Sequence, residues 1–170
     1  ALELARLTGA RCGFLGEAAD SVGGYVAGAV PGAKGLDAAR MVAQPRKAYV
    51  LLGVEPELDC ADGAAALAAL QSAATVVALS AFRSDSALAH ADVLLPIAPF
   101  TETSGTFINT EGRVQSFHAT VKPLGECRPA WKVLRVLGNL LGAEGFAQES
   151  SEAVRAETLA GATEFAGGLD

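Results

Sequence analysis

ADVLLPIAPFTETSGTFINTEGRVQSF, residues 91–117, decides the fold, because it joins a buried strand to a loop and a hairpin. Residues 92–96 (DVLLP) form a short apolar strand that ends at proline, which has no amide hydrogen for a ladder. Ligands gather at the carboxyl ends of parallel strands, and the loop 97–106 leaves from such an end. Gly105 and Gly112 then allow two tight changes of direction. We therefore predict a hairpin with arms at residues 107–108 and 114–117.

The preceding sequence predicts alternating strands and helices. Residues 48–53 (AYVLLG) are a continuous apolar run, as expected for a strand buried on both faces. Asp59 and Asp62 are candidate caps for an alanine-rich helix over residues 63–73, and residues 75–80 supply a second buried strand. A short helix over 84–90, capped by the serines before it, leads to a third strand. Because such crossovers are right-handed, the strands should be parallel. The predicted fold class is α/β: a Rossmann-like, mostly parallel sheet flanked by helices, with an added hairpin.

The amino-terminal part reads as a helix over residues 1–8, a short strand over 11–15 and a brief helix over 36–43. The glycine-rich stretch 17–34 between them is predicted to be a loop. Its glycines do not follow a strand in the GxGxxG arrangement, so the pattern gives little support to a dinucleotide site.

The carboxyl-terminal part reads as a helix over residues 129–141 and a last helix over 148–160, followed by an acidic, glycine-rich tail expected to fray. The inward side of the first helix is predicted to hold Trp131, Leu134, Leu137 and Leu141. We predict one α/β domain over residues 1–146, and a helix with its tail over residues 147–170.

Composition excludes several classes of function. The chain has 170 residues, 51% of them hydrophobic, and a net charge of −6, which gives no electrostatic case for nucleic acid or anionic lipid. No apolar run approaches the roughly 20 residues that span a bilayer. Since residue 1 is alanine and residues 1–8 read as a helix rather than a signal peptide, we expect a piece of a longer polypeptide.

The sequence shows no pattern for binding a metal. Cys12, Cys60 and Cys127 are far apart, which predicts reduced, mostly buried thiols of a cytoplasmic protein rather than cluster ligands. His90 and His118 have no ligand at metal spacing and are interpreted as structural. The serines lack the GxSxG context of a hydrolase.

Residues 91–117 resemble the molybdopterin oxidoreductase superfamily, in which a strand ending in ADVxLP is followed by Glu, GTF, Asn and EGRVQ. All of these elements are present. The closer resemblance is to the large iron–sulfur subunit of proton-pumping NADH:quinone oxidoreductase, respiratory complex I. It spans roughly residues 7–142 and includes YVLLGVEP (49–56), IAPFTETS (97–104), PLGECR (123–128) and PAWKVLRVLGN (129–139).

The resemblance implies a vestigial cofactor pocket at Gly53, Glu55 and Pro56. In the metal-bearing members, the matching strand is followed by a G-x-N-P turn that approaches the nucleotide of the molybdopterin cofactor. Glu55 in place of the amide removes two donors and places negative charge where a phosphate would lie. We therefore expect no catalytic residue, metal or cofactor in this segment.

Glu102, Asn109, Glu111 and Arg113 form a polar group that could in principle bind a substrate. A structural role is simpler, because Asn109 and Glu111 suit turn hydrogen bonds. Arg113 could form a bidentate pair with Glu102 or Glu111 that fixes the loop. We interpret these residues as a structural loop.

The resemblance implies a non-catalytic scaffold within a subunit that relays electrons from NADH, along iron–sulfur clusters bound upstream of residue 1, towards quinone. Its partners would be the upstream part of the same subunit and other peripheral-arm subunits, on the cytoplasmic side of a bacterial inner membrane. Two alternatives stay open. One is the cofactor cradle of a molybdenum or tungsten oxidoreductase, such as a formate dehydrogenase or nitrate reductase, and the other is a free-standing nucleotide-binding module.

Overall fold

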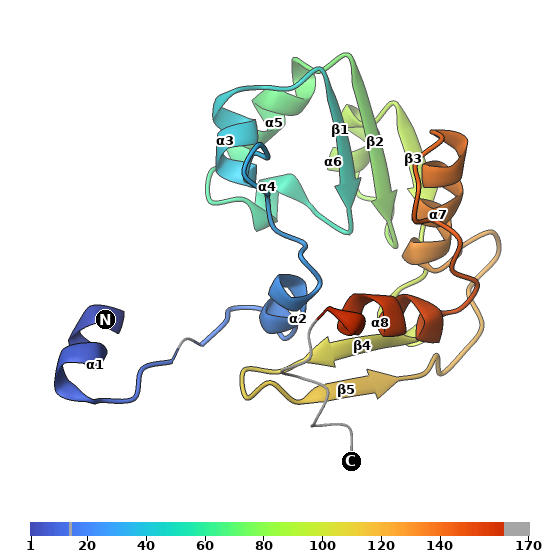
Figure 1. The fold of residues 1–170 in the computed structure, drawn as a ribbon. Coiled ribbons are helices and arrows are strands. Elements are labelled where there is room, and N and C mark those ends of the chain that lie inside the picture. Colours follow the sequence, from blue (N-terminus) through green and yellow to red (C-terminus); the bar gives the residue numbers. More distant parts are fainter. Residues whose placement is uncertain (14, 162–170) are drawn as a thin grey trace. The chain divides into compact units, whose positions relative to one another are not determined.

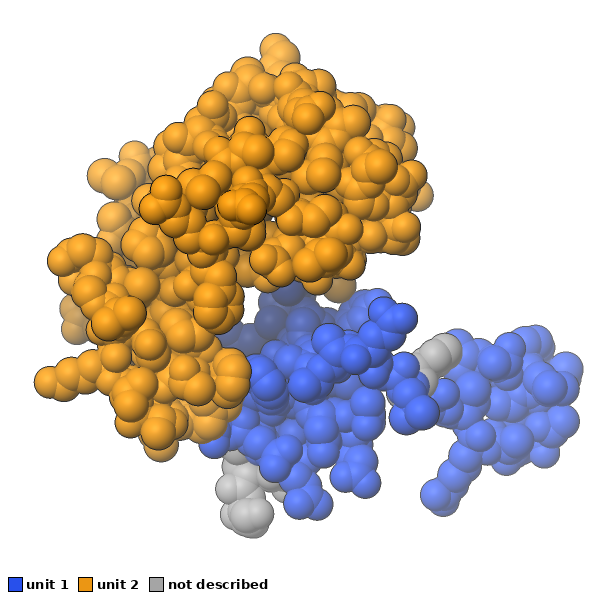
Figure 2. Space-filling model, turned by 180° about the vertical axis from the view of Figure 1, so that it is seen from behind, with its two compact units in different colours: residues 1–29, 106–116, 155–170 blue, residues 30–105, 117–154 orange. Residues whose placement is uncertain are grey.

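The computed structural model describes residues 1–13 and 15–161, which form two compact units (Figure 2). Unit 1 comprises residues 1–29, 106–116 and 155–170, and unit 2 comprises residues 30–105 and 117–154. The predicted division after residue 146 stays a prediction. Most of the acidic tail, residues 162–170, lies outside the described residues.

Unit 2 contains a three-stranded parallel sheet, which confirms the predicted fold class. Its strands are β1 (Ala48–Leu52), β2 (Thr75–Ser80) and β3 (Val93–Pro96), in the order β1-β2-β3 (Figure 1). Beyond β3, Ile97 forms an isolated parallel bridge with Arg128. Pro96 is tolerated because it occupies the last position of an outer strand.

Helices α3 (Ala38–Ala43), α4 (Pro56–Asp59), α5 (Gly63–Gln71) and α6 (Asp85–His90) belong to the same unit. Asp62 caps α5 by accepting from Ala65 N at 2.9 Å, and Ser84 caps α6 in the same way, as predicted. Asp59 does not cap α5. It lies inside α4, and its Oδ2 accepts from Glu55 N at 2.7 Å. The short helix α4 was not predicted, and the Asp59 side chain stabilises its first turn through this hydrogen bond.

The core of unit 2 lies between one face of the sheet and α5. Val76 and Ala78 of β2 are buried on this face, and so are three residues of α5, Ala66, Ala69 and Leu70. Small alanine side chains let the helix approach the sheet closely. The side chain of Tyr49 ties α3 to β1, because its hydroxyl donates to Met41 O at 2.9 Å.

Helix α7 (Ala130–Leu140) follows a 3-10 turn η1 (Phe100–Glu102) and the hairpin along the chain, and α8 (Ser151–Ala160) comes last. Both helices were predicted, but Leu141 does not face inward: it is 75% exposed. The buried position of α7 is Gly138, where a Cβ atom would lie 2.5 Å from the Phe146 ring. The ring of Phe146, from the loop after α7, therefore packs directly against Gly138.

Unit 1 contains α1 (Leu2–Thr8), α2 (Ser21–Val26) and most of the hairpin of β4 (Gly105–Ile108) and β5 (Val114–Phe117). The hairpin confirms the prediction. The predicted strand over residues 11–15 is wrong for its described residues, 11–13 and 15, which are exposed and have no ladder partner. The predicted loop over 17–34 contains α2, whose preceding residue Asp20 accepts from Ile108 N at 2.8 Å.

Candidate functional site

The site candidate begins where β1 ends, at the carboxyl edge of the parallel sheet. Gly53 follows β1 directly with a φ of 59°, a left-handed conformation that glycine adopts at no steric cost. Its N–H still donates to Leu79 O at 2.8 Å, so the turn leaves the sheet only after the ladder is complete. Val54, Glu55 and Pro56 follow this turn and line a cavity together with Leu51 of β1 and Ser80 at the end of β2.

Glu55 and Pro56 start α4. Pro56 is buried at the first helical position, where a missing N–H costs nothing. The carbonyl of Glu55 accepts from Leu58 N at 2.9 Å and from Asp59 N at 2.8 Å. The N–H and the carbonyl of Glu55 are therefore both already used within α4.

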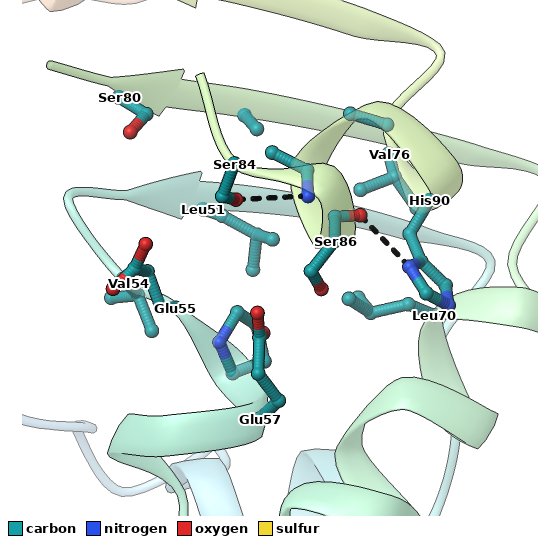
Figure 3. A pocket seen from close by; sticks show the side chains of 14 residues that line it. Leu51, Val54, Glu55, Glu57, Leu70, Val76, Ser80, Ser84, Ser86 and His90 are labelled. Carbon is teal, nitrogen blue, oxygen red and sulfur yellow. Dashed lines mark hydrogen bonds between the residues drawn. The ribbon is translucent and has the colours of Figure 1, made fainter. Parts of the chain in front are cut away.

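A cavity of about 20 Å³ lies between this turn, β2 and α6 (Figure 3). A buried water needs roughly 10–15 Å³, so the cavity holds about one. Its walls are mostly apolar, with polar groups from α4, from α6 and from the end of β2. The residues that line it are Leu51, Val54, Glu55, Pro56, Glu57, Leu70, Val76, Ala78, Ser80, Ser84, Ser86, Ala87, His90 and Ala91.

Glu57 contributes an unusual group to this cavity. Its Oε2 atom is buried and has no hydrogen-bond partner in the described structure. The carboxylate of Glu57 and the hydroxyl of Ser86 both point into the cavity in Figure 3. The lining includes two carboxylates, those of Glu55 and Glu57, and no lysine or arginine. The site therefore favours a hydrogen-bond donor such as water and disfavours an anion.

The remaining polar side chains of the cavity have local structural partners. The Ser84 hydroxyl accepts from Ala87 N at 3.1 Å, and the Ser80 hydroxyl donates to Phe82 O at 2.8 Å. His90 Nδ1 lies 2.9 Å from Ser86 O, so this nitrogen carries the proton and donates. Neither serine is paired with the histidine, and the arrangement lacks the nucleophile and base of a hydrolase.

His90 is held on its other side as well. Its Nε2 lies 3.3 Å from the Gln71 amide nitrogen and accepts from it, because Nδ1 already carries the ring proton. These two bonds place His90 between α5 and α6, where it joins the helices.

The predicted structural loop is divided between the two units. In unit 2, Glu102 Oε2 accepts from Leu124 N at 3.0 Å. In unit 1, Asn109 Oδ1 accepts from the backbone N–H groups of Glu111 and Arg113, at 3.0 and 2.9 Å. The ion pair that we expected between Arg113 and either Glu102 or Glu111 is not among the ion pairs of the described residues. The asparagine amide closes the turn, so no arginine pair is needed.

The cysteines are free, and their predicted burial is wrong for Cys12, which is exposed, while Cys60 and Cys127 are half-buried. The described residues contain no group of three His, Cys, Asp or Glu side chains placed to hold a metal ion. No helix among those residues has the length and apolar character needed to cross a bilayer.

Sequence reasoning missed two side chains that organise the sheet, Glu57 beside the turn after β1 and Asp92 at the start of β2. Glu57 was not considered, although the sequence PELD shortly after the apolar strand β1, with proline at its first position, is a signal for a short helix. Asp92 was assigned to the start of a strand, yet its Oδ2 accepts from Val76 N at 2.7 Å and holds the start of β2. An aspartate just before an apolar strand is a signal for a side chain that accepts a hydrogen bond from the backbone of the neighbouring strand.

Comparison with known proteins gives one family. The model of the molybdopterin oxidoreductase family matches residues 3–140, most of the chain. The fold fits this match, because the parallel sheet and its helices lie within the matched residues.

Individual relatives match shorter stretches. A provisionally named formate dehydrogenase of Staphylococcus aureus (strain bovine RF122 / ET3-1) is 50% identical over 52 residues, which cover 31% of this chain and 5% of that protein. The mitochondrial NADH-ubiquinone oxidoreductase 78 kDa subunit of Candida albicans is 47% identical over 60 residues, which cover 35% of this chain and 8% of that subunit. The matched part of the chain thus spans less than a tenth of either relative.

Proposed function

Because the chain belongs to the molybdopterin oxidoreductase family, we propose that it is a non-catalytic scaffold segment of the large iron–sulfur subunit of proton-pumping NADH:quinone oxidoreductase. The similarity to the 78 kDa subunit supports this function. The whole subunit would relay electrons from NADH through iron–sulfur clusters towards quinone. This segment would hold none of those clusters and would not oxidise NADH by itself.

The chemistry of the cavity at the carboxyl end of the sheet carries the proposal. A molybdopterin nucleotide bears phosphates, and a phosphate site offers free backbone N–H groups or basic side chains. The lining residues offer the carboxylates of Glu55 and Glu57 instead, in about 20 Å³. The N–H of Glu55 is already bonded to Asp59. The residues present therefore do not fit the nucleotide part of the cofactor.

The proposed setting follows from this function. The partners would be the rest of the same subunit and the neighbouring peripheral-arm subunits, on the cytoplasmic side of a bacterial inner membrane. The absence of a membrane-spanning helix among the described residues is compatible with this placement.

Metal analysis of the intact natural polypeptide tests the proposal. We expect iron without stoichiometric molybdenum or tungsten, and no NADH oxidation by residues 1–170 alone. One atom of molybdenum or tungsten per polypeptide would refute the proposal.

The second candidate is a molybdenum or tungsten oxidoreductase with this segment in its cofactor cradle. This candidate is favoured by the 50% identity, over 52 residues, to the Staphylococcus aureus relative whose provisional name is formate dehydrogenase. Formate-dependent reduction of a dye by the intact polypeptide, together with bound molybdenum or tungsten, would establish it.

A further inference from the structure

One face of the parallel sheet of unit 2 is aliphatic and partly open. Strand register aligns Val50, Val77 and Val93 in one row across the sheet. A second row on the same face consists of Leu52, Leu79 and Leu95. We call these six side chains the open face. All six are aliphatic, which is the pattern of a sheet face buried in the complete fold.

The open face is covered only in its centre. Leu79 is fully buried, but Val50 is 57% exposed, Leu52 is 44% exposed and Val93 is 43% exposed. Two of these exposed side chains belong to β1. A parallel sheet normally has helices on both faces, so this aliphatic surface lacks part of a layer, over Val50, Leu52 and Val93.

The helices between the strands lie on the opposite face. Leu70 of α5 and Ala87 of α6 line the cavity together with Leu51, Val76 and Ala78, which alternate with the residues of the open face. This placement has a topological cause. The chain moves from β1 to β2 to β3 in one direction, and right-handed crossovers made in one direction place their helices on one face. A helix on the open face requires a crossover that runs across the sheet in the opposite direction, away from β3, and such a crossover starts from a strand next to the outer edge of β1.

The outer edge of β1 can accept such a strand. β1 is a terminal strand of the sheet, and its sequence AYVLL contains no charge and no proline that would block pairing. β3, the other terminal strand, is followed by the bridge between Ile97 and Arg128, so that edge is partly in use. The free edge and the open face thus meet at the same strand.

We propose that a strand–helix unit of the same polypeptide, from outside residues 1–170, completes this sheet. Its strand pairs in parallel with β1, and the apolar side of its helix covers Val50, Leu52 and Val93. The relatives supply the reason for choosing this occupant, because the stretch they share with this chain is 8% or less of their length. The inference goes beyond the proposed function and holds for either candidate function.

Cysteine labelling tests the occupant. Val50→Cys and Val93→Cys are placed in a background where Cys12, Cys60 and Cys127 are serine, and the rate of reaction with a water-soluble maleimide is measured. Each rate is divided by that of the same variant in denaturing urea. Glu126→Cys, at a side chain that is 92% exposed, calibrates free access in residues 1–170.

We expect both open-face cysteines to react about a hundredfold more slowly in the full polypeptide than in residues 1–170, because reaction then requires local opening. Hydrogen exchange on the polypeptide without cysteine variants should show the same gain of protection at the β1 amides. Equal rates in both polypeptides would overturn the proposal. So would protection that appears only when other subunits are added, or protection within residues 1–170 that rises with concentration, since these identify a separate subunit or a second copy. An open reading frame limited to residues 1–170 would also overturn it.

Discussion

Gly63 at the start of α5 is the position where one added methyl group should do most damage. A Cβ atom there would lie 2.5 Å from the Glu57 carbonyl oxygen and 2.9 Å from two further backbone atoms of Glu57. Ordinary contact begins at 3.4 Å, so α4 and α5 would have to separate by about 0.9 Å. Helix α4 carries Pro56, which is buried, so this movement would disturb the packing at the end of the sheet.

The expected magnitude follows from two opposing effects. Overpacking of this kind costs about 1–3 kcal/mol. Alanine gains at most about 1 kcal/mol over glycine in a helix, and less at its first position. Gly63→Ala should therefore lower the free energy of unfolding by about 1–2 kcal/mol. Gly63→Ser has the same Cβ and should lose a similar amount.

Urea unfolding followed by far-ultraviolet circular dichroism and by the fluorescence of Trp131 measures this loss. Gly32→Ala is the matched control in the same unit, because its Cβ meets nothing within 4 Å and its φ is not positive. That control should keep or slightly raise stability, by up to about 1 kcal/mol. A Gly63→Ala protein as stable as the unchanged chain would refute the reasoning about α4 and α5.

Three further predictions concern single side chains. Asp20→Ala should lower the free energy of unfolding by about 1–2 kcal/mol, since Ile108 N loses its acceptor. Asp20→Asn keeps an acceptor oxygen and should retain most of the stability. Equal urea midpoints for the two variants would contradict this. Asn109→Ala should cost about 1 kcal/mol because two backbone N–H groups of the hairpin turn lose their acceptor, and hydrogen exchange at these amides should rise several-fold; unchanged exchange would count against the Asn109 turn. The pKa of Glu152 lies below its ordinary value of 4.5, because of a hydrogen bond with its own backbone and one from the hydroxyl of the preceding serine. Its stabilisation of α8 should be complete above pH 4.5 and lost as the pH falls through the lowered pKa, and a carboxyl titration midpoint at or above 4.5 by NMR would exclude this effect.

The regular elements of unit 2 could be predicted because their signals are local. The run AYVLL is apolar at every position, and this pattern predicted the strand β1. Its predicted burial on both faces is wrong, because Val50 is 57% exposed and Leu52 is 44% exposed. Asp62 and Ser84 could be assigned as caps because a cap acts within three residues of the helix start. The hairpin was predictable for the same reason.

The vestigial pocket predicted at Gly53, Glu55 and Pro56 stays a prediction. Glu55 and Pro56 line the cavity, and so does Glu57, which was missed. The Oε2 atom of Glu57 is buried where α4 packs against Gly63 of the next helix, and no spacing in the sequence predicts that contact. Arg113 shows the converse error, since opposite charges close in sequence suggested a pair that the asparagine amide made unnecessary.

The sequence by itself determined the family, the order of the strands β1 to β5 with the helices α5 and α6 between them, and the parallel direction of the sheet. The family is indicated by the resemblance of ordered motifs, whereas the strands, helices and strand direction follow from hydrophobic periodicity, caps and turns, which act over a few residues. Only the tertiary structure decided that the cavity has room for about one water and that an aliphatic face remains open beside β1. Cavity volume and side-chain exposure depend on packing between residues that are far apart in the chain, and a local sequence pattern does not predict that packing.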